Sequence, residues 1–426
     1  MSEKKKINSQ CKILAVTGRS AESLVRNCLP KNVELKVLPI NVAAFITQKL
    51  ILENISREYA KQFDIILVPG LVQGDTCSLK DNLDVPVVKG PKYASDIEMT
   101  LNEIDVFELS TIYPADQHLR ARKFEETTQL LREGFTKAVD KKLNEFSIGS
   151  PHSFPVGISR PPLVMAEIVD APKLTLEQVI ERANYYLSHG VEILDIGALA
   201  NNPQPDKIIK IIKELKQLQG KSNFAISIDT LNVEEIEAAV KAKVDLILSI
   251  DHSNVEQLGP KIPKDTGVVI VPTNICEGYM PKKPAERVES LIQLQKKLQD
   301  FGLTKIIADP IIEMPIYPGF INSLRGYIGF REQEASTPMM TCIGNVTEFI
   351  AADAVGINVL FTTIAVELGI QFLLATDVSA KCRGGVSEIV KGRNLAYAAK
   401  CRNAPPKGHG INVLLAKSRT ANDLDM

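Results

Sequence analysis

Eight short apolar segments in the later part of the chain constrain its fold more than any other feature. They lie at residues 163–169, 192–196, 224–228, 246–250, 268–271, 305–308, 339–343 and 372–375. Helical periodicity fills most of the intervals, at residues 174–188, 207–218, 233–242, 284–301, 357–368 and 387–402. Eight strands that alternate with helices over about 250 residues are typical of a (β/α)8 barrel. We therefore predict that residues 160–404 form a TIM barrel.

Three parts of this region are less regular. The fourth strand is followed by a short crossover at residues 254–260, and residues 315–338 predict a long, irregular connection. In the tail at residues 405–426, we expect one more short helix or strand followed by irregular chain.

The first 150 residues show a shorter alternation of strands and helices. Strand patterns lie at residues 12–16, 33–39, 64–68 and 85–88, and helical patterns lie at residues 21–28 and 45–60. This alternation favours a small parallel α/β domain of the Rossmann or flavodoxin type, whose role the sequence leaves open. Thr17 and Gly18 indicate a turn, because the rest of a GxGxxG phosphate loop is missing.

The two regions are joined by a stretch of different character. A charged helical pattern covers residues 123–144, and residues 147–162 are rich in Gly and Pro. Such clusters are typical of linkers, so we place the domain boundary at residues 150–160.

Composition argues against several classes of function. The 426 residues carry 50 Lys and Arg against 51 Asp and Glu, which leaves no basic surplus for nucleic acid. No apolar run reaches the roughly 18 residues of a membrane span, and the first ten residues lack the apolar core of a signal peptide. Seven cysteines without CxxC spacing favour reduced thiols in the cytoplasm. We therefore expect a cytoplasmic protein with a small-molecule ligand.

Almost every predicted barrel strand ends in small polar side chains. In chain order they are Asp170, Asp195, Asp229, Ser249, Asp251, Asn274, Asp309, Asn345 and Asp377. The carboxyl ends of the strands form the active site of a TIM barrel, so these side chains are expected to converge. A ring of carboxylates and amides suits a heterocycle with N–H donors and ring nitrogens. A divalent metal is a second interpretation of the ring, and single members such as Asp195 or Asp377 could instead cap helices.

Basic and nucleophilic residues give weaker signals. Lys381, Arg383 and Arg393 follow the last strand around a Gly-Gly pair, a pattern that suits a phosphate or diphosphate and equally a solvated basic face. His252 is interpreted as a capping or solvated histidine. Cys276 and Cys342 lack a positioned base and are interpreted as buried thiols.

The order of these motifs resembles a known family. VMAEI, ILDIG, ISIDT, ILSID, IIADPII and GNVTE follow one another as in the pterin-binding barrels. These are dihydropteroate synthase and the methyltetrahydrofolate:corrinoid methyltransferases. The chain resembles most the archaeal dihydropteroate synthase-related proteins, which carry an extra N-terminal domain. The resemblance covers residues 163–402 and implies that a pterin is the substrate.

The resemblance also implies roles for single residues. Asp229 matches the third-strand Asp that contacts the pterin ring, and Asp309 matches the sixth-strand Asp that binds the amino-pyrimidinone edge. Asp195 matches the second-strand Asp of both groups. Ser249 stands where both groups have Asn, and Asp251 is the alternative for that contact. A carboxylate suits such an edge because it accepts two N–H bonds side by side.

Departures from the synthase pattern leave the reaction open. The synthases' Arg-Lys pair after the seventh strand is replaced by residues 344–347, which resemble the Ser-Asn-Val-Ser of the methyltransferases. Asn345 thereby takes the place of an Asn that bonds the pterin N5, and Asp170 also fits the methyltransferase pattern better. Asn-Asn-Pro at residues 201–203 and Thr-Asp at residues 376–377 replace further basic residues of the synthases, for which Lys381, Arg383 and Arg393 are candidate substitutes.

The sequence therefore leaves three functions open, which are given in order of preference. The first is a transferase that condenses a dihydropterin-methyl diphosphate with aminobenzoate or ribofuranosylaminobenzene phosphate, in folate or tetrahydromethanopterin biosynthesis, with Mg²⁺ as an optional cofactor. The second is a methyltransferase that uses a reduced methylpterin and a corrinoid or other acceptor, although the first domain lacks a DxHxxG cobalamin motif. The third is a non-catalytic pterin-binding protein. Asn345 and Asp229 are the catalytic candidates, and the resemblance implies a homodimer.

Overall fold

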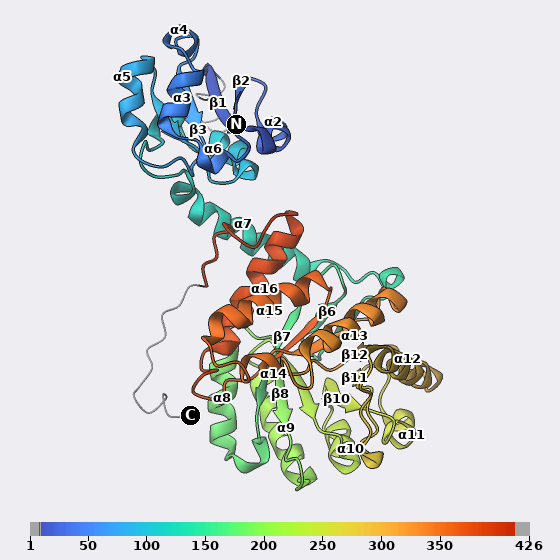
Figure 1. Ribbon diagram of the computed structural model, residues 1–426. Coiled ribbons are helices and arrows are strands. Elements are labelled where there is room, and N and C mark those ends of the chain that lie inside the picture. Colours follow the sequence, from blue (N-terminus) through green and yellow to red (C-terminus); the bar gives the residue numbers. More distant parts are fainter. Residues whose placement is uncertain (1–7, 9, 414–426) are drawn as a thin grey trace. The chain divides into compact units, whose positions relative to one another are not determined.

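The chain folds into two compact units, which are described separately (Figure 1). The computed structural model describes residue 8 and residues 10–413. The first unit ends at Glu126 and the second begins at Thr127. Within the described part of the chain, no helix is both long and apolar enough to cross a membrane.

The first unit is built on a parallel four-stranded sheet with the order β2-β1-β3-β4. The strands are β1 (Ile13–Gly18), β2 (Val33–Leu38), β3 (Ile65–Val68) and β4 (Val87–Lys89). The helices between and after them are α2 (Glu22–Cys28), α3 (Gln48–Asn54), α4 (Arg57–Ala60), α5 (Leu79–Leu83) and α6 (Ile97–Glu103). Leu14 and Ile66 lie in one apolar cluster, whereas Ile13 and Ile65 lie in another. The sheet is thus covered on both faces, which confirms the predicted α/β unit.

The helix predicted at residues 45–60 is divided in the structure. Its first part, α3, begins after Thr47, whose side chain accepts a hydrogen bond from the backbone of Leu50. Its second part, α4, begins after Ser56, which accepts from the backbone of Tyr59. Hydroxyl side chains at these positions satisfy the free N–H groups of a new helix, so a second start is favoured over one continuous helix.

The charged helix lies earlier than expected, at α7 (Asp116–Thr136) rather than at residues 123–144. After it, the Asp140 side chain accepts a hydrogen bond from the backbone of Lys142, and Asn144 adopts a left-handed conformation. The Gly- and Pro-rich stretch is also more than a linker. It holds an antiparallel hairpin of β5 (Phe146–Ile148) and β6 (Phe154–Val156).

The hairpin belongs to the second unit, because Ile148, Phe154 and Val156 pack in the same apolar cluster as side chains from the barrel strands. The buried ion pair between Arg160 and Glu145, at 2.7 Å, ties the end of this segment to its beginning. The units therefore divide at residue 126, earlier than the sequence-based boundary at residues 150–160.

The second unit is a parallel (β/α)8 barrel, as predicted. Its strands are β7 (Leu163–Ile168), β8 (Ile193–Gly197), β9 (Ala225–Asp229), β10 (Leu246–Ile250), β11 (Gly267–Ile270), β12 (Ile306–Ala308), β13 (Met340–Cys342) and β14 (Phe372–Ala375). Hydrogen bonds join them in the order β12-β11-β10-β9-β8-β7-β14-β13. A bridge between Ala308 and Met339, with the Ala308 N–H 2.9 Å from the Pro338 carbonyl, brings the two end strands together.

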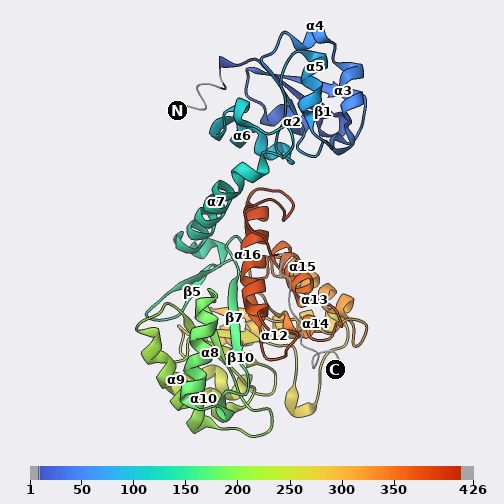
Figure 2. The same ribbon diagram turned by 90° about the vertical axis from the view of Figure 1, so that its left-hand side faces the viewer.

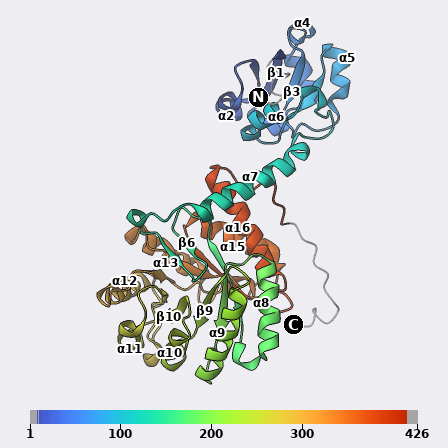
Figure 3. The ribbon, with the colours of Figure 1, turned by 180° about the vertical axis from the view of Figure 1, so that it is seen from behind.

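Helices surround the strands on the outside of the barrel (Figures 2 and 3). They are α8 (Leu176–Ser188), α9 (Pro205–Gln219), α10 (Val233–Lys241), α11 (Val255–Leu258), α12 (Pro284–Asp300), α13 (Phe320–Gln333), α14 (Gly344–Thr347), α15 (Ala354–Glu367) and α16 (Gly385–Cys401). The short α11 matches the short fourth crossover. The interval at residues 315–338 is more regular than predicted, because it contains the fourteen-residue α13. Residues 402–413 add no helix or strand, and the rest of the predicted tail lies outside the described residues.

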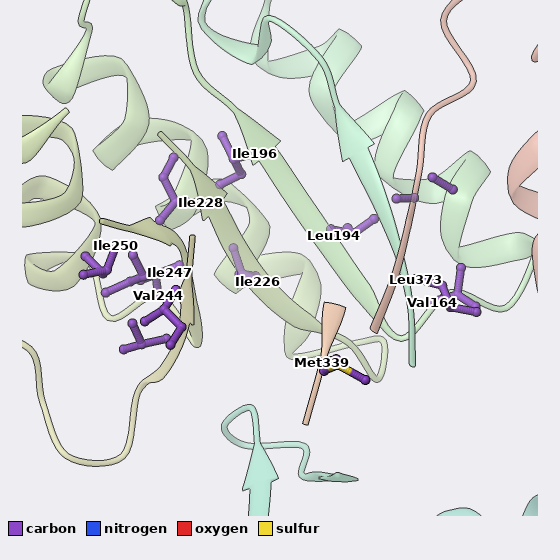
Figure 4. Close-up of a cluster of buried hydrophobic side chains, with 14 of the residues drawn as sticks. Val164, Leu194, Ile196, Ile226, Ile228, Val244, Ile247, Ile250, Met339 and Leu373 are labelled. Carbon is purple, nitrogen blue, oxygen red and sulfur yellow. The ribbon is translucent and has the colours of Figure 1, made fainter. Parts of the chain in front are cut away.

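Alternation along the strands separates two layers of the core. Val164, Leu194 and Ile226 point outward into the cluster between strands and helices (Figure 4). Met165, Ile193 and Ala225 belong to the inner cluster, which also includes side chains of the hairpin. Since successive side chains of a strand face opposite ways, residues two positions further along share the inner direction. This parity brings polar side chains inward at the carboxyl ends of three neighbouring strands.

Candidate functional site

An acidic layer lies directly above the apolar interior at the carboxyl ends of β7, β8 and β9. In the sheet register, Met165 pairs with Ile193, and Glu167 pairs with Asp195 two residues later. Asp195 in turn pairs with Ser227, and Asp229 follows two residues beyond Ser227. The three carboxylates therefore come from adjacent strands and one inward-facing parity, which explains why they meet.

One carboxylate oxygen from each of Glu167, Asp195 and Asp229 lies within 4.8 Å of the other two. We call these three residues the acidic triad. Ser227 donates its hydroxyl hydrogen to Oδ1 of Asp195 over 2.5 Å. The other oxygen of Asp195, Oδ2, is buried and has no hydrogen-bond partner among the described residues.

Burial and mutual repulsion raise the pKa of all three carboxyls. Burial raises the pKa of Glu167 to about 7, with further increases from the charges of Asp229 and Asp170. Burial and the charge of Asp309 raise the pKa of Asp229 to about 6. The pKa of the fully buried Asp195 rises well above its ordinary value, again mainly because of burial. Strongly shifted groups at a strand-end site indicate a functional site.

Asp309 follows β12 and lies near enough to Asp229 for its charge to raise the pKa of that carboxyl. Its Oδ1 accepts hydrogen bonds from the backbone N–H of Ile311 and from the hydroxyl of Tyr327, each over 2.8 Å. Burial raises the pKa of Asp309 to about 6, although these hydrogen bonds and Arg287 act in the opposite direction. Tyr327 is itself fully buried on α13, and its hydroxyl oxygen also lies 3.0 Å from the Met340 carbonyl. The orientation of Asp309 is therefore fixed from two sides.

Asn345 lies on α14, next to the loop that carries Asp309. Its Nδ2 donates to the carbonyl of Ile312 over 3.1 Å, so the loops after the sixth and seventh strands are joined there. Cys342 precedes it, and burial raises the pKa of that thiol to about 12, with smaller contributions from Glu167 and Asp309. A thiol in this state is a poor nucleophile.

Two of the three basic residues expected near a phosphate are engaged elsewhere. Lys381 donates to the carbonyls of Thr347 and Ile350, which ties the last loop to the loop after β13. Arg393 is buried and bonds the Pro162 carbonyl over 2.5 Å and Glu192 over 3.1 Å, at the amino ends of β7 and β8. Arg383 is exposed in the loop after β14.

Asp251 holds its own loops together. Its Oδ1 accepts from the backbone and hydroxyl of Ser253, and its Oδ2 accepts from the Thr273 hydroxyl and the Ile275 backbone. Both oxygens are thus engaged within the protein. The suggestion that Asp251 replaces the family's Asn contact therefore has little support in this geometry.

The remaining strand-end candidates differ in their surroundings. Asp170 has a left-handed backbone and forms an exposed ion pair with Lys173 at 2.7 Å. The carbonyl of Ser249 accepts a hydrogen bond from Asn254 over 3.3 Å. The side-chain oxygen of Asn274 is buried without a partner in the described structure. Asp377 caps α16, because its Oδ1 accepts from the Gly385 backbone over 2.7 Å.

The structure also shows the surroundings of His252 and Cys276. The Nε2 of His252 lies 2.8 Å from the hydroxyl of Ser290, and burial lowers the pKa of this imidazole. This agrees with a structural role for His252. Cys276, which the sequence suggested was buried, is exposed in the loop after β11.

Sequence reasoning missed two residues of the site. Glu167 lies within an apolar strand rather than at its end, so attention to strand ends passed over it. An acidic residue inside LVMAEI at an inward-facing position was the available signal. Tyr327 was missed because its helix fell in a segment predicted to be irregular.

Comparison with known proteins finds two family matches in this chain. A family described as pterin binding enzyme matches residues 169–317, and a family of unknown function matches residues 11–92. An uncharacterised protein of Methanocaldococcus jannaschii is 33% identical over 420 residues, which cover 96% of this chain and 78% of that protein. Dihydropteroate synthase of Streptococcus pyogenes is 27% identical over 79 residues, 17% of this chain and 30% of that enzyme.

Among solved structures, Yersinia pestis dihydropteroate synthase with a pterine–sulfa conjugate is similar. It covers 60% of this chain and 100% of its own, at 17% identity and a TM-score of 0.46.

The chain belongs to the pterin-binding, dihydropteroate synthase-like family. Within that family it shares both of its units with the Methanocaldococcus jannaschii protein, because their similarity extends over nearly the whole chain.

Proposed function

We propose that the barrel binds a reduced pterin between Asp229 and Asp309 and condenses its diphosphate-activated methylene group with an aromatic amine. The observation that carries this proposal is the pair of half-buried carboxyls at the carboxyl ends of β9 and β12, each with a pKa raised to about 6. The local match to a dihydropteroate synthase supports the same class of reaction.

A pterin satisfies these carboxylates chemically. Its amino-pyrimidinone edge presents N–H donors side by side, and a carboxylate accepts two such bonds in one plane. Asp309 is held for this contact by Tyr327 and by the backbone of Ile311. A buried ring that supplies donors also offsets the cost of the buried charges.

The condensation needs no protein nucleophile. The lone pair of the amine nitrogen forms a bond to the exocyclic methylene carbon while the carbon–oxygen bond breaks. Diphosphate leaves with the electron pair of that bond, and the proton of the amine passes to solvent. The residues named here would contribute binding and orientation, which lower the barrier by placing the two reactants together.

The basic residues limit where the diphosphate could lie. Lys381 and Arg393 are bound to backbone carbonyls, so of the three candidates Arg383 alone is exposed for this contact. A phosphate on the amine substrate, as in ribofuranosylaminobenzene phosphate, would be a second anion that the charge of Arg383 could bind.

A methyltransferase is the second candidate, and Asn345 favours it. Its Nδ2 bonds the Ile312 carbonyl in the loop that follows Asp309, so the amide lies close to the expected pterin. An amide there can bond a ring nitrogen of a methylpterin as the methyl group leaves.

One assay separates the two reactions. Purified protein is mixed with hydroxymethyl-dihydropterin diphosphate, Mg²⁺ and either aminobenzoate or its ribofuranosyl phosphate derivative, and diphosphate release is followed. Release that depends on the amine supports condensation, and the preferred amine identifies the substrate. Absence of release in a protein that binds the pterin contradicts condensation and favours methyl transfer.

A further inference from the structure

The acidic triad has the geometry of a cation site. One carboxylate oxygen from each of Glu167, Asp195 and Asp229 lies within 4.8 Å of the others. Oxygen ligands around Mg²⁺ or Ca²⁺ stand about 2.0–2.6 Å from the ion, so two ligands of one ion are separated by no more than about 5 Å. For Mg²⁺, whose oxygen ligands stand about 2.0–2.1 Å from the ion, that limit is about 4.2 Å, so the three oxygens lie close to the spacing that one ion requires.

A second observation points to a missing ligand. Asp195 is fully buried, and its Oδ1 takes the hydrogen bond of Ser227. Its Oδ2 is buried with no partner among the described residues. A buried carboxylate oxygen without a donor is costly, so a ligand that contacts it would be strongly favoured.

The charges around the acidic triad also favour a bound cation. The charged groups that act on its members are other carboxylates, namely Asp170, Asp309 and Glu348. Within the described structure, no Lys or Arg forms an ion pair with Glu167, Asp195 or Asp229. The pterin proposed above would meet Asp229 and Asp309, which leaves Glu167 and Asp195 without a positive partner.

We propose that Glu167, Asp195 and Asp229 bind a divalent cation of the hard, oxygen-preferring class, Mg²⁺ or Mn²⁺. Zinc is disfavoured because its protein sites are built mainly from His and Cys, and the triad has neither. The site goes beyond the proposed function and does not require it, because the triad is complete without a pterin. Asp229 would then contact both the cation and the pterin.

The test uses the full-length protein, treated with a chelator and free of pterin. Mn²⁺ is added up to millimolar concentration, and free Mn²⁺ is measured by electron paramagnetic resonance. We expect one tight Mn²⁺ per wild-type chain. Glu167→Gln and Asp195→Asn should each weaken this affinity at least about tenfold, because even the loss of a residue that only supports a metal ligand commonly costs that much.

Asp170→Asn is the matched control. Asp170 lies at the end of the same strand as Glu167 but outside the triad, and it pairs with Lys173. We expect this variant to keep the Mn²⁺ affinity within about threefold, because Asp170 supplies no oxygen to the triad and its exposed charge is paired with Lys173.

Thermal unfolding distinguishes loss of the ion from loss of the fold. At the same Mn²⁺ concentration, the Tm of the wild-type protein should rise more than that of Glu167→Gln, because stabilisation by a ligand falls as its affinity for the folded state falls. Without metal, Glu167→Gln should melt no lower than wild type, since it removes a repelling charge.

The proposal is overturned if wild type binds no Mn²⁺, or if both triad variants bind it as tightly as Asp170→Asn. Either result leaves the pterin proposal intact, because pterin binding is measured separately in the presence of chelator.

Discussion

The hydroxyl of Tyr327 donates to Oδ1 of Asp309 over 2.8 Å, and the backbone N–H of Ile311 donates to the same oxygen. Oδ1 of Asp309 thus accepts both of these hydrogen bonds. Tyr327 is also anchored to the Met340 carbonyl on the neighbouring strand. The residue that fixes Asp309 is therefore part of the barrel core rather than of a loop.

Removal of the Tyr327 hydroxyl should leave the Asp309 carboxylate less firmly oriented. We expect Tyr327→Phe to weaken the binding of a dihydropterin about three- to tenfold, because one hydrogen bond contributes about 0.5–1.5 kcal/mol. Calorimetric titration measures the affinity. Tyr185→Phe is the control, since its hydroxyl bonds the helix-capping Asp377. Equal affinities for both variants would show that Tyr327 does not position Asp309.

The raised pKa of Asp309 makes a prediction about stability. Burial raises it from 3.8 to about 6, so the folded state takes up a proton between these values before the unfolded state does. The free energy of unfolding contributed by Asp309 is therefore highest at acid pH and falls as pH rises through about 6. Asp309→Asn should remove this loss, which is on the order of 2–3 kcal/mol.

Urea unfolding at pH 5 and pH 8, with chelator present, tests the sign. The variant should gain stability relative to wild type as the pH rises. A difference between the two proteins that stays constant over this range would argue that Asp309 is not buried as a charged group.

Asn345 distinguishes the two candidate reactions. If condensation is the activity, Asn345→Ala should lower amine-dependent diphosphate release less than about tenfold, because only a bond to the Ile312 carbonyl and a ring contact are lost. Steady-state rates with the preferred amine give the answer. A decrease of more than about a hundredfold would assign Asn345 a role in the chemical step.

Lys381 and Arg383 should behave differently, although they are two residues apart. Lys381→Met is expected to lower the free energy of unfolding by about 1–3 kcal/mol, since the carbonyls of Thr347 and Ile350 lose their charged donor. Arg383→Met should leave stability unchanged and raise the KM for the pterin diphosphate by about tenfold. Melting curves and kinetics of both variants test this pair, and a reversed pattern would place the diphosphate at Lys381.

Much of the barrel could be predicted because its strands are short, apolar and evenly spaced. All eight predicted strand segments match strands of the structure within two residues at either end. The side chains that cap helices were harder to recognise in the sequence. The break in the helix at residues 45–60 depends on Thr47 and Ser56 as helix caps, which a hydrophobic pattern does not reveal.

The site was predictable only in part, because partners from distant segments decide what a side chain can do. Asp229 and Asp309 lie together because parallel strands end at one edge. The positive charge of Lys381 looked available in the sequence, but its partners come from the preceding loop. Asp251 is likewise engaged by Thr273 from the loop after the next strand. Glu167 lies inside the apolar pattern that identified its strand.

Whether this barrel end binds a pterin is tested by the affinity of the metal-free protein for a dihydropterin, compared between wild type and Asp309→Ala. We expect measurable binding by wild type and a loss of at least about a hundredfold in the variant, since a charged acceptor of two N–H bonds disappears. Asp170→Asn should bind like wild type. Equal affinity of Asp309→Ala and wild type, or no binding by either, would contradict the assignment of this barrel end as a pterin site.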